Sequence, residues 1–113
     1  MKKVFLFLML SVFAGVFAQD KKSKNARHDV EVLGNCDMCK KRIEKAAFGV
    51  AGVKSAEWHS DDQMLHLIIN EQKTSVEEVE KAIAKAGHDT RDVKAADSDY
   101  GALHGCCKYD RKP

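Results

Sequence analysis

The amino-acid sequence predicts an α+β fold in which two helices cover one face of a four-stranded antiparallel sheet. Over residues 29–94, strand-like and amphipathic helical segments follow one another in the order β-α-β-β-α-β, which is the ferredoxin-like sandwich. The chain has 113 residues, a length that suits one small domain with one modest core. No internal repeat of solenoid length is present in the sequence.

The first strand and the first helix come from the segment that begins at His28. "HDVEVLG" alternates, with Val30 and Val32 on one side and acidic residues on the other, as in a half-buried strand. After Cys39, apolar residues recur every three or four positions, as on the buried face of a helix. These residues are Ile43, Ala46, Ala47 and Val50. We expect this helix to end near Gly49.

A hairpin and a second helix follow. Gly52 marks a turn into "VKSAEWHS", and "SDDQ" separates this strand from "MLHLIIN". The segment "TSVEEVEKAIAKAG" has a capping box of Ser75 and Glu78 at its start and Gly87 where a helix usually ends. The charged segment "HDTRDVKA" is predicted to form a weak fourth strand at the edge of the sheet.

Residues 1–18 are predicted to be a signal peptide rather than part of the fold. Lys2 and Lys3 precede the apolar run "VFLFLMLSVFAGVF", which is short for a membrane span, and Ala18 follows small residues suited to cleavage. An uncleaved membrane anchor is the less favoured alternative. We therefore expect an exported protein, periplasmic if its source has an outer membrane, with no membrane insertion after cleavage.

The rest of the chain divides into a flexible leader (19–28), the folded domain (29–94) and a C-terminal extension (95–113). The whole chain has 19 Lys and Arg against 17 Asp and Glu, and two of the lysines lie in residues 1–18. The mature protein is therefore formally neutral. Because phosphate binding needs an excess of cations on one face, nucleic acid is not an expected partner.

All four cysteines lie in the part that is predicted to be exported. Cys36 and Cys39 form a CxxC motif, and Cys106 and Cys107 are adjacent. An oxidising compartment and an even number of cysteines first suggest disulfides. In small disulfide-rich domains, however, the disulfides usually join segments that are distant in sequence, whereas the two cysteines of each pair here are close in sequence. The spacing therefore favours metal binding or thiol exchange.

The predicted fold places Cys36 in the loop before the first helix and Cys39 in its first turn. Unpaired N–H groups at the start of a helix lower the pKa of a nearby thiol, so that a thiolate forms more readily. Two thiolates provide a soft site of low coordination number. Such a site selects Cu(I) or Hg(II) over hard cations, and it accepts Zn(II) if further ligands arrive.

Three segments resemble the heavy-metal-associated (HMA) domain family: "CDMCKKRIEKA", "VAGVKSAEW" and "SVEEVEKAIAKAGHD". The family includes copper chaperones, metal-binding modules of copper-exporting ATPases and periplasmic mercury-binding proteins. The resemblance implies that Cys36 and Cys39 are the primary ligands of one soft metal ion. It also implies transfer by thiolate exchange to a metal-transporting ATPase or another metal-binding protein. We expect a monomer or a metal-bridged dimer.

The motif region departs from the usual pattern of the family. Gly34 and Asn35 stand where methionine and threonine are usual, so we expect a looser loop. His88 stands where bacterial members commonly have tyrosine, in a loop that lies near the metal in this family. We expect His88 to be either a nitrogen ligand or an exposed loop residue. Met38, inside the motif, is either a thioether ligand or, more often at such positions, a flexible surface residue.

The C-terminal segment "LHGCCKY" places His104, Cys106 and Cys107 close together. Adjacent cysteines do not easily give both sulfur atoms to one tetrahedral ion, because the ring that this closes is strained. We expect the tail to fold back so that these residues act as secondary ligands, protect the metal from oxidation or resolve a disulfide. A strained adjacent disulfide, or a bridge that staples the tail to the domain, is the alternative.

Three further residues have simpler interpretations. His59 and His66 fall on the two hairpin strands and are predicted to face each other on the exposed side of the sheet. Without a third ligand, we expect them to contact solvent. Trp58 is expected in the core.

These observations predict a non-enzymatic protein that carries or buffers a soft metal ion, with Cu(I) ahead of Hg(II) or Zn(II). Two alternatives stay open. A CxxC motif at a helix start is also the layout of thiol–disulfide exchange proteins, but the only proline here is Pro113, and their cis-proline loop is missing. Structural zinc held by all four cysteines would make folding depend on the metal.

Overall fold

The computed structural model describes residues 22–113, and the predicted signal peptide lies outside this part of the chain. The elements are β1 (Ala26–Glu31), α1 (Asp37–Phe48), β2 (Val53–His59), β3 (Met64–Ile69), α2 (Val76–Lys85), α3 (Asp97–Gly101) and the 3-10 turn η1 (Gly105–Cys107). The first five follow the predicted order, although β1 begins inside the stretch predicted to be the leader. In residues 22–113, every helix is too short or too polar to cross a membrane.

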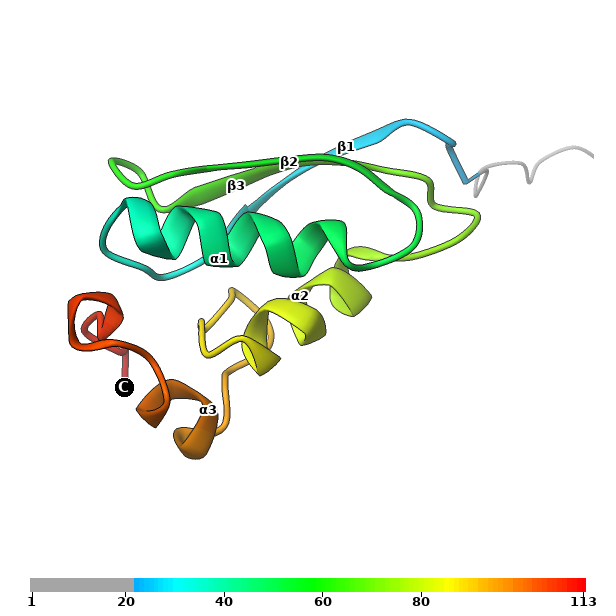
Figure 1. The fold of residues 1–113 in the computed structure, drawn as a ribbon. Coiled ribbons are helices and arrows are strands. Elements are labelled where there is room, and N and C mark those ends of the chain that lie inside the picture. The colour runs from blue at the N-terminus through cyan, green and yellow to red at the C-terminus, as the bar shows by residue number, and fades with distance from the viewer. Residues whose placement is uncertain (1–21) are drawn as a thin grey trace, which may run out of the picture.

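The strands form an antiparallel sheet in the order β1-β3-β2. Both long helices, α1 and α2, lie on one face of this sheet (Figure 1). Side chains alternate between the two faces of each strand, and those on the helix side form the core with the apolar faces of α1 and α2. The core includes Val30, Ile43, Ala47, Ala56, Trp58, Leu65, Leu67, Ile69, Val79 and Ile83. Trp58 is therefore buried, as predicted.

Local signals define both ends of α2. The Ser75 side chain accepts a hydrogen bond from the Glu78 N–H at 3.2 Å, which is one half of the expected capping box. Gly87 ends the helix with a φ of +105°, a left-handed conformation that glycine adopts without strain. A Cβ at Gly87 would lie 2.8 Å from a methyl group of Leu103, so the C-terminal segment packs directly against this turn.

The prediction of a fourth strand is wrong. Residues 88–94 contribute one isolated bridge, between Val32 and Thr90, instead of a strand. The chain then turns away from the sheet, because the N–H and the hydroxyl of Thr90 both donate to the Val93 carbonyl, at 2.8 and 2.9 Å. The ferredoxin-like plan is kept, but its sheet has three strands.

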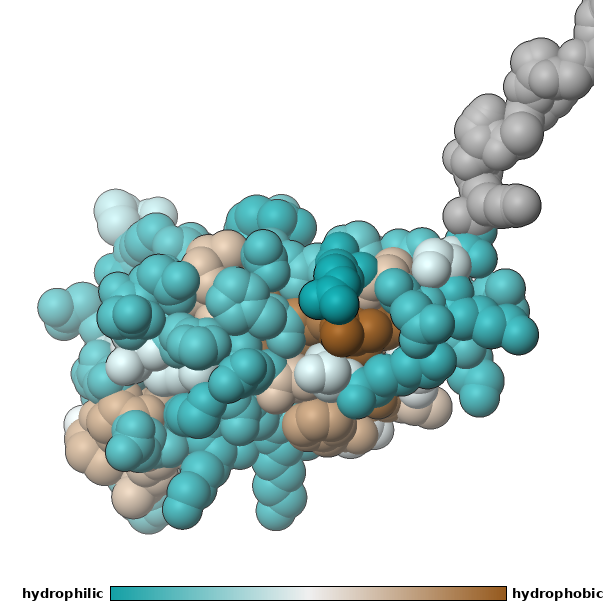
Figure 2. Space-filling view, turned by 90° about the horizontal axis from the view of Figure 1, so that it is seen from above, coloured by the Kyte–Doolittle hydropathy of each residue, from teal (hydrophilic) through white to brown (hydrophobic). Residues whose placement is uncertain are grey.

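The face of the sheet opposite the helices is open to solvent. Seen from above, this outer face is mostly hydrophilic, with small hydrophobic patches (Figure 2). The rings of His59 and His66 meet edge to face here, with their centroids 5.1 Å apart. The prediction that these two histidines face each other on the exposed side is confirmed.

Candidate metal centre

The CxxC motif lies where a loop enters α1. Cys36 immediately precedes the helix, and Cys39 lies in its first turn. Their sulfur atoms are 3.8 Å apart. Cys39 is fully buried and Cys36 is partly exposed, so the motif presents one sulfur toward the surface and the other toward the core.

The start of α1 makes Cys36 more acidic. The backbone N–H of Cys39 has the largest effect on the pKa of the Cys36 thiol, and the N–H of Met38 adds to it. Partial burial opposes them, but the pKa stays below its ordinary value. Because the thiolate is the form that binds soft metals, Cys36 is prepared to act as a ligand.

The loop before Cys36 is held from two sides. The Gly34 N–H donates to the side-chain oxygen of Gln63 at 3.1 Å. A Cβ at Gly34 would lie 3.1 Å from the Cβ of Cys39 and 3.2 Å from the Trp58 ring. The indole therefore fills the space beside Gly34, and the loop is more tightly packed than the glycine led us to expect.

Residues 95–113, which we call the C-terminal arm, continue past α2 and return to the start of α1 (Figure 1). Arg111 anchors the arm through a two-pronged ion pair with Asp89, at 2.9 Å from Nε and 2.8 Å from Nη2. Burial raises the pKa of the Asp89 carboxyl, but the hydrogen bonds from Arg111 and the Ala95 N–H, with the charges of Arg111 and Lys94, together leave the pKa below its ordinary value. Bidentate pairs of this kind are among the stronger hydrogen-bonded contacts in proteins.

Tyr109 holds the arm at the same place, and Tyr100 braces Tyr109 within the arm. The Tyr109 hydroxyl accepts from the Asp89 N–H and donates to the Gly87 carbonyl, both at 2.8 Å. Burial raises the pKa of Tyr109 to about 12. The Tyr100 hydroxyl donates to the Tyr109 carbonyl at 2.6 Å. The arm is thus a docked element, fixed by polar contacts that are largely shielded from water.

The docked arm brings cysteines from two distant segments together. The sulfur atoms of Cys36, Cys106 and Cys107 all lie within 4.8 Å of one another. The Asn35 side chain donates to the Cys106 carbonyl at 3.2 Å, and the Met38 sulfur lies 3.8 Å from the Cys106 sulfur. The arm folds back to the motif as expected, and all four cysteines are free thiols.

The two arm thiols differ in exposure. Cys106 is exposed, whereas Cys107 is buried. Burial raises the pKa of the Cys107 thiol well above its ordinary value, and the neighbouring thiols of Cys39 and Cys106 raise it further. Cys107 is therefore a neutral thiol in the absence of metal, and it must release a proton to become a ligand.

The two histidines predicted as secondary ligands have different environments. His88 is fully buried, with its Nδ1–H donating to the Leu33 carbonyl at 2.8 Å and its ring stacked on Tyr109. Its Nε2 is buried without a hydrogen-bond partner in the described part of the chain, and burial lowers its pKa. His104 is exposed and precedes η1. Among residues 22–113, the set of mutually close ligand atoms contains three sulfurs and neither histidine.

The cysteine cluster supplies sulfur atoms, which are soft metal ligands. Cys36 belongs to both the CxxC pair and the group of three sulfurs, so it is the shared member of any ligand set built here. Thiolates at this spacing need only small side-chain rotations to surround one ion, and they favour Cu(I) and other soft cations. The roles of the individual residues as ligands remain predictions.

The residues that dock the arm were not found from the sequence. Asp89, Tyr109 and Arg111 lie in charged, irregular segments without helical or strand periodicity. Tyr109 and Arg111 stand within four positions of Cys107, but nothing in a single sequence pairs Arg111 with one particular carboxylate. Gln63, which holds the loop at Gly34, was expected only as a turn residue.

Comparisons with known proteins agree with this geometry. No family model matches the chain. Over 57 residues the chain is 33% identical to the copper chaperone CopZ of Staphylococcus haemolyticus, covering 50% of this chain and 84% of the relative. Its structure resembles a CopZ metallochaperone with a TM-score of 0.56 and 26% identity, over 57% of this chain and 98% of the other. Oxidised MerP from Ralstonia metallidurans CH34 also gives a TM-score of 0.56, with 27% identity, over 58% and 93% of the two chains.

Proposed function

This chain belongs to the heavy-metal-associated domain family, and from that premise we propose that it binds a soft metal ion, Cu(I) first, and carries or buffers it. The observation that supports this most directly is the group of three sulfur atoms within 4.8 Å of one another at the CxxC loop. The relatives are metallochaperones, which are not enzymes, and this protein is likewise not an enzyme.

Cu(I) is the first choice because the relatives are copper chaperones and because the three mutually close ligand atoms found in residues 22–113 are all sulfur. A d¹⁰ cation with a preference for thiolates is satisfied by two or three such ligands. Hg(II) suits the same donors. Zn(II) in a closed site needs four ligands in a tetrahedron, which requires both adjacent arm cysteines to serve one ion.

Binding begins at Cys36. Its lowered pKa favours the thiolate that forms a sulfur–metal bond, and Cys39 lies 3.8 Å away to form the second. An arm thiol then supplies a third bond, and each thiol that becomes a ligand releases one proton to solvent. No electron is transferred in these steps.

Release proceeds by ligand exchange with another protein. A cysteine thiolate of the partner forms a bond to the ion as a bond to Cys36 or to an arm cysteine breaks, and the released thiolate takes up a proton. The surface beside the cluster favours docking, since Met38 is 49% exposed and borders a hollow lined by Lys41, Arg42 and Lys45. A metal-binding domain with an acidic surface, such as one on a metal-transporting ATPase, fits this chemistry.

We also propose that the protein works outside the cytoplasm. The support is the N-terminal sequence, in which a short basic region precedes an apolar run and small residues. An arm that covers the exposed side of a thiol cluster is useful in an oxidising compartment, because unprotected thiolates there form disulfides.

An anaerobic titration tests this function. The reduced protein is titrated with Cu(I) in competition with a chromophoric chelator, beside a Cys36→Ser/Cys39→Ser variant and a Ser60→Ala control. We expect one Cu(I) per chain in the parent and in the control, and an affinity at least about 100-fold lower in the cysteine variant. Equal Cu(I) affinity in the cysteine variant and the parent contradicts the proposal.

A further inference from the structure

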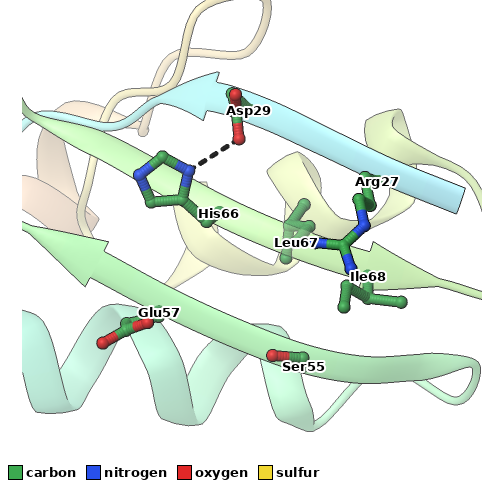
Figure 3. Close-up of a pocket in the computed structure, with 7 residues that line it drawn as sticks. All are labelled: Arg27, Asp29, Ser55, Glu57, His66, Leu67 and Ile68. Carbon is green, nitrogen blue, oxygen red and sulfur yellow. Dashed lines mark hydrogen bonds and ion pairs between the residues drawn. The ribbon is translucent and has the colours of Figure 1, made fainter.

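A second group of metal-ligating side chains lies on the outer face of the sheet, away from the sulfur cluster. The strand register places Asp29, His66 and Glu57 in one row across β1, β3 and β2. His59 lies two residues beyond Glu57 on the same face of β2, where its ring meets that of His66. Figure 3 shows the Asp29, His66 and Glu57 side chains on neighbouring strands.

His66 is already oriented as a metal ligand would be. Its Nδ1 lies 2.6 Å from Oδ1 of Asp29, as the dashed line in Figure 3 marks. An ionised carboxylate only accepts hydrogen bonds, so Nδ1 carries a proton, and in the neutral imidazole Nε2 is then the nitrogen with the lone pair. Histidines that bind metals usually donate their other N–H to a carboxylate in this way, which fixes both the tautomer and the ring.

A second histidine–carboxylate pair faces the first. The Nε2 of His59 lies 3.8 Å from Oε2 of Glu57. The His59 and His66 side chains are 43% and 44% exposed, and that of Glu57 is 64% exposed. These side chains can change rotamer without disturbing the core, whereas the strands that carry them are fixed by the hydrogen bonds of the sheet.

The charge on this part of the sheet favours a cation. Asp29 and Glu57 lie on either side of His66 in the same row. A hollow on this face is lined by Asp29, Glu57, His66 and one base, Arg27. Arg27 pairs with Ile68, two residues along β3 from His66 and on the opposite side of His66 from His59, so the guanidinium lies away from the histidine pair.

We propose that His59 and His66 form a second metal site, which binds a borderline divalent cation such as Zn(II) or Cu(II). His66 contributes Nε2, His59 contributes one ring nitrogen, Glu57 contributes a carboxylate oxygen, and water completes the coordination. Asp29 acts as a positioning residue through Nδ1 of His66. Imidazole and carboxylate suit these ions, whereas the thiol cluster suits soft ions, so the two sites sort metals by their ligands.

The site uses no residue of the sulfur cluster and faces the other side of the sheet from α1. It is therefore independent of the proposed Cu(I) function. Either one can fail while the other holds.

The test separates the two sites by removing the thiols. In the full chain, four substitutions leave the histidines as the strongest ligands for Zn(II): Cys36→Ser, Cys39→Ser, Cys106→Ser and Cys107→Ser. Zn(II) is then titrated by calorimetry, and Cu(II) is added for electron paramagnetic resonance. We expect one Zn(II) per chain and a Cu(II) spectrum with coupling to two imidazole nitrogens.

Single substitutions in this background identify the ligands. We expect His66→Ala and His59→Ala each to lower the Zn(II) affinity at least about 10-fold, and Asp29→Asn to lower it by about 10-fold. His28 is a matched control, since its Nε2 lies 2.9 Å from Oε2 of Glu71 but the pair has no second histidine beside it. We expect His28→Ala to leave the Zn(II) affinity unchanged.

Three results would overturn the second site. These are the absence of Zn(II) binding, an affinity that His66→Ala does not change, and an equal loss in His28→Ala, which would indicate unspecific surface binding. If the four-serine chain does not fold, the parent protein is saturated anaerobically with Cu(I), and Zn(II) is added while the histidine ring signals are followed by nuclear magnetic resonance. The site then predicts shifts for His59 and His66, and unshifted signals reject it.

Discussion

The two halves of the sulfur cluster are built in different ways. The loop half, Cys36 and Cys39, depends on local geometry, because a strand, a tight loop and the start of α1 place both sulfurs within a few residues. The arm half, Cys106 and Cys107, arrives from the other end of the chain. Its position depends on a few side-chain contacts, above all that between Arg111 and Asp89.

This difference means that the two halves can be separated experimentally. The loop half shares its packing with the core, since Cys39 and Trp58 both enclose Gly34. We expect a single substitution far from the sulfurs, at the contact between Arg111 and Asp89, to loosen the arm half.

The largest effect is expected for Arg111→Met. The change removes the partner of Asp89, whose side chain is 3% exposed, and leaves a buried carboxylate unpaired. We expect the free energy of unfolding to fall by about 3 kcal/mol, measured by urea denaturation. Cu(I) affinity should fall toward that of a Cys106→Ser/Cys107→Ser variant.

Arg91→Met is the matched control for this change. Arg91 pairs with Asp92, but the two side chains are 53% and 56% exposed. Exposed pairs contribute little, so we expect a loss of less than about 1 kcal/mol. Equal losses in the two variants would show that the arm is not held by the Asp89 contact.

Tyr109→Phe should have the next largest effect. It removes a hydroxyl that joins the Asp89 N–H to the Gly87 carbonyl, and leaves both groups buried without that partner. We expect a loss of about 2 kcal/mol in the free energy of unfolding. Tyr100→Phe removes one hydrogen bond at a half-buried position, and its loss should be about 1 kcal/mol. The reverse order would mean that the contact within the arm, between Tyr100 and Tyr109, stabilises the protein more than the contact between Tyr109 and the domain.

Gly34→Ala tests the loop half. The new methyl group meets the Trp58 ring and the Cys39 Cβ at 3.2 and 3.1 Å, so neighbouring atoms must shift. We expect a loss of about 1 kcal/mol in thermal or urea denaturation. In Gly105→Ala, on the arm, the methyl group meets nothing within 4 Å, and we expect no comparable loss. A neutral Gly34→Ala would mean that the loop is loose.

The pH dependence of stability should contain a contribution from the arm. Burial raises the pKa of Asp89, but Arg111, together with the Ala95 N–H and Lys94, leaves it lower in the folded protein than its ordinary value. The stabilisation is therefore complete above about pH 4 and is lost as the pH falls through the folded-state pKa. Acid unfolding followed by circular dichroism should be less steep in Arg111→Met than in the parent. Identical acid profiles would contradict this.

The contrast also explains how much could be predicted from the sequence. Alternation around Val30, helical spacing after Cys39 and the Ser75 cap are local signals, and they correctly predicted five elements and the position of the motif. The prediction of a fourth strand failed because Thr90 forms a hydrogen bond to Val93, and the chain does not continue the hydrogen bonding of the sheet. The return of the arm was expected from its cysteines, but its attachment depends on contacts between segments that no periodicity connects.

X-ray absorption spectroscopy at the copper edge tests the central claim most directly. The Cu(I)-loaded parent and the Cys106→Ser/Cys107→Ser variant are prepared anaerobically, and the number of sulfur ligands is determined for each. A single site built from both halves predicts three sulfur ligands in the parent and two in the variant. Two sulfur ligands in both proteins would show that the arm lies beside the metal without binding it, and would contradict the account.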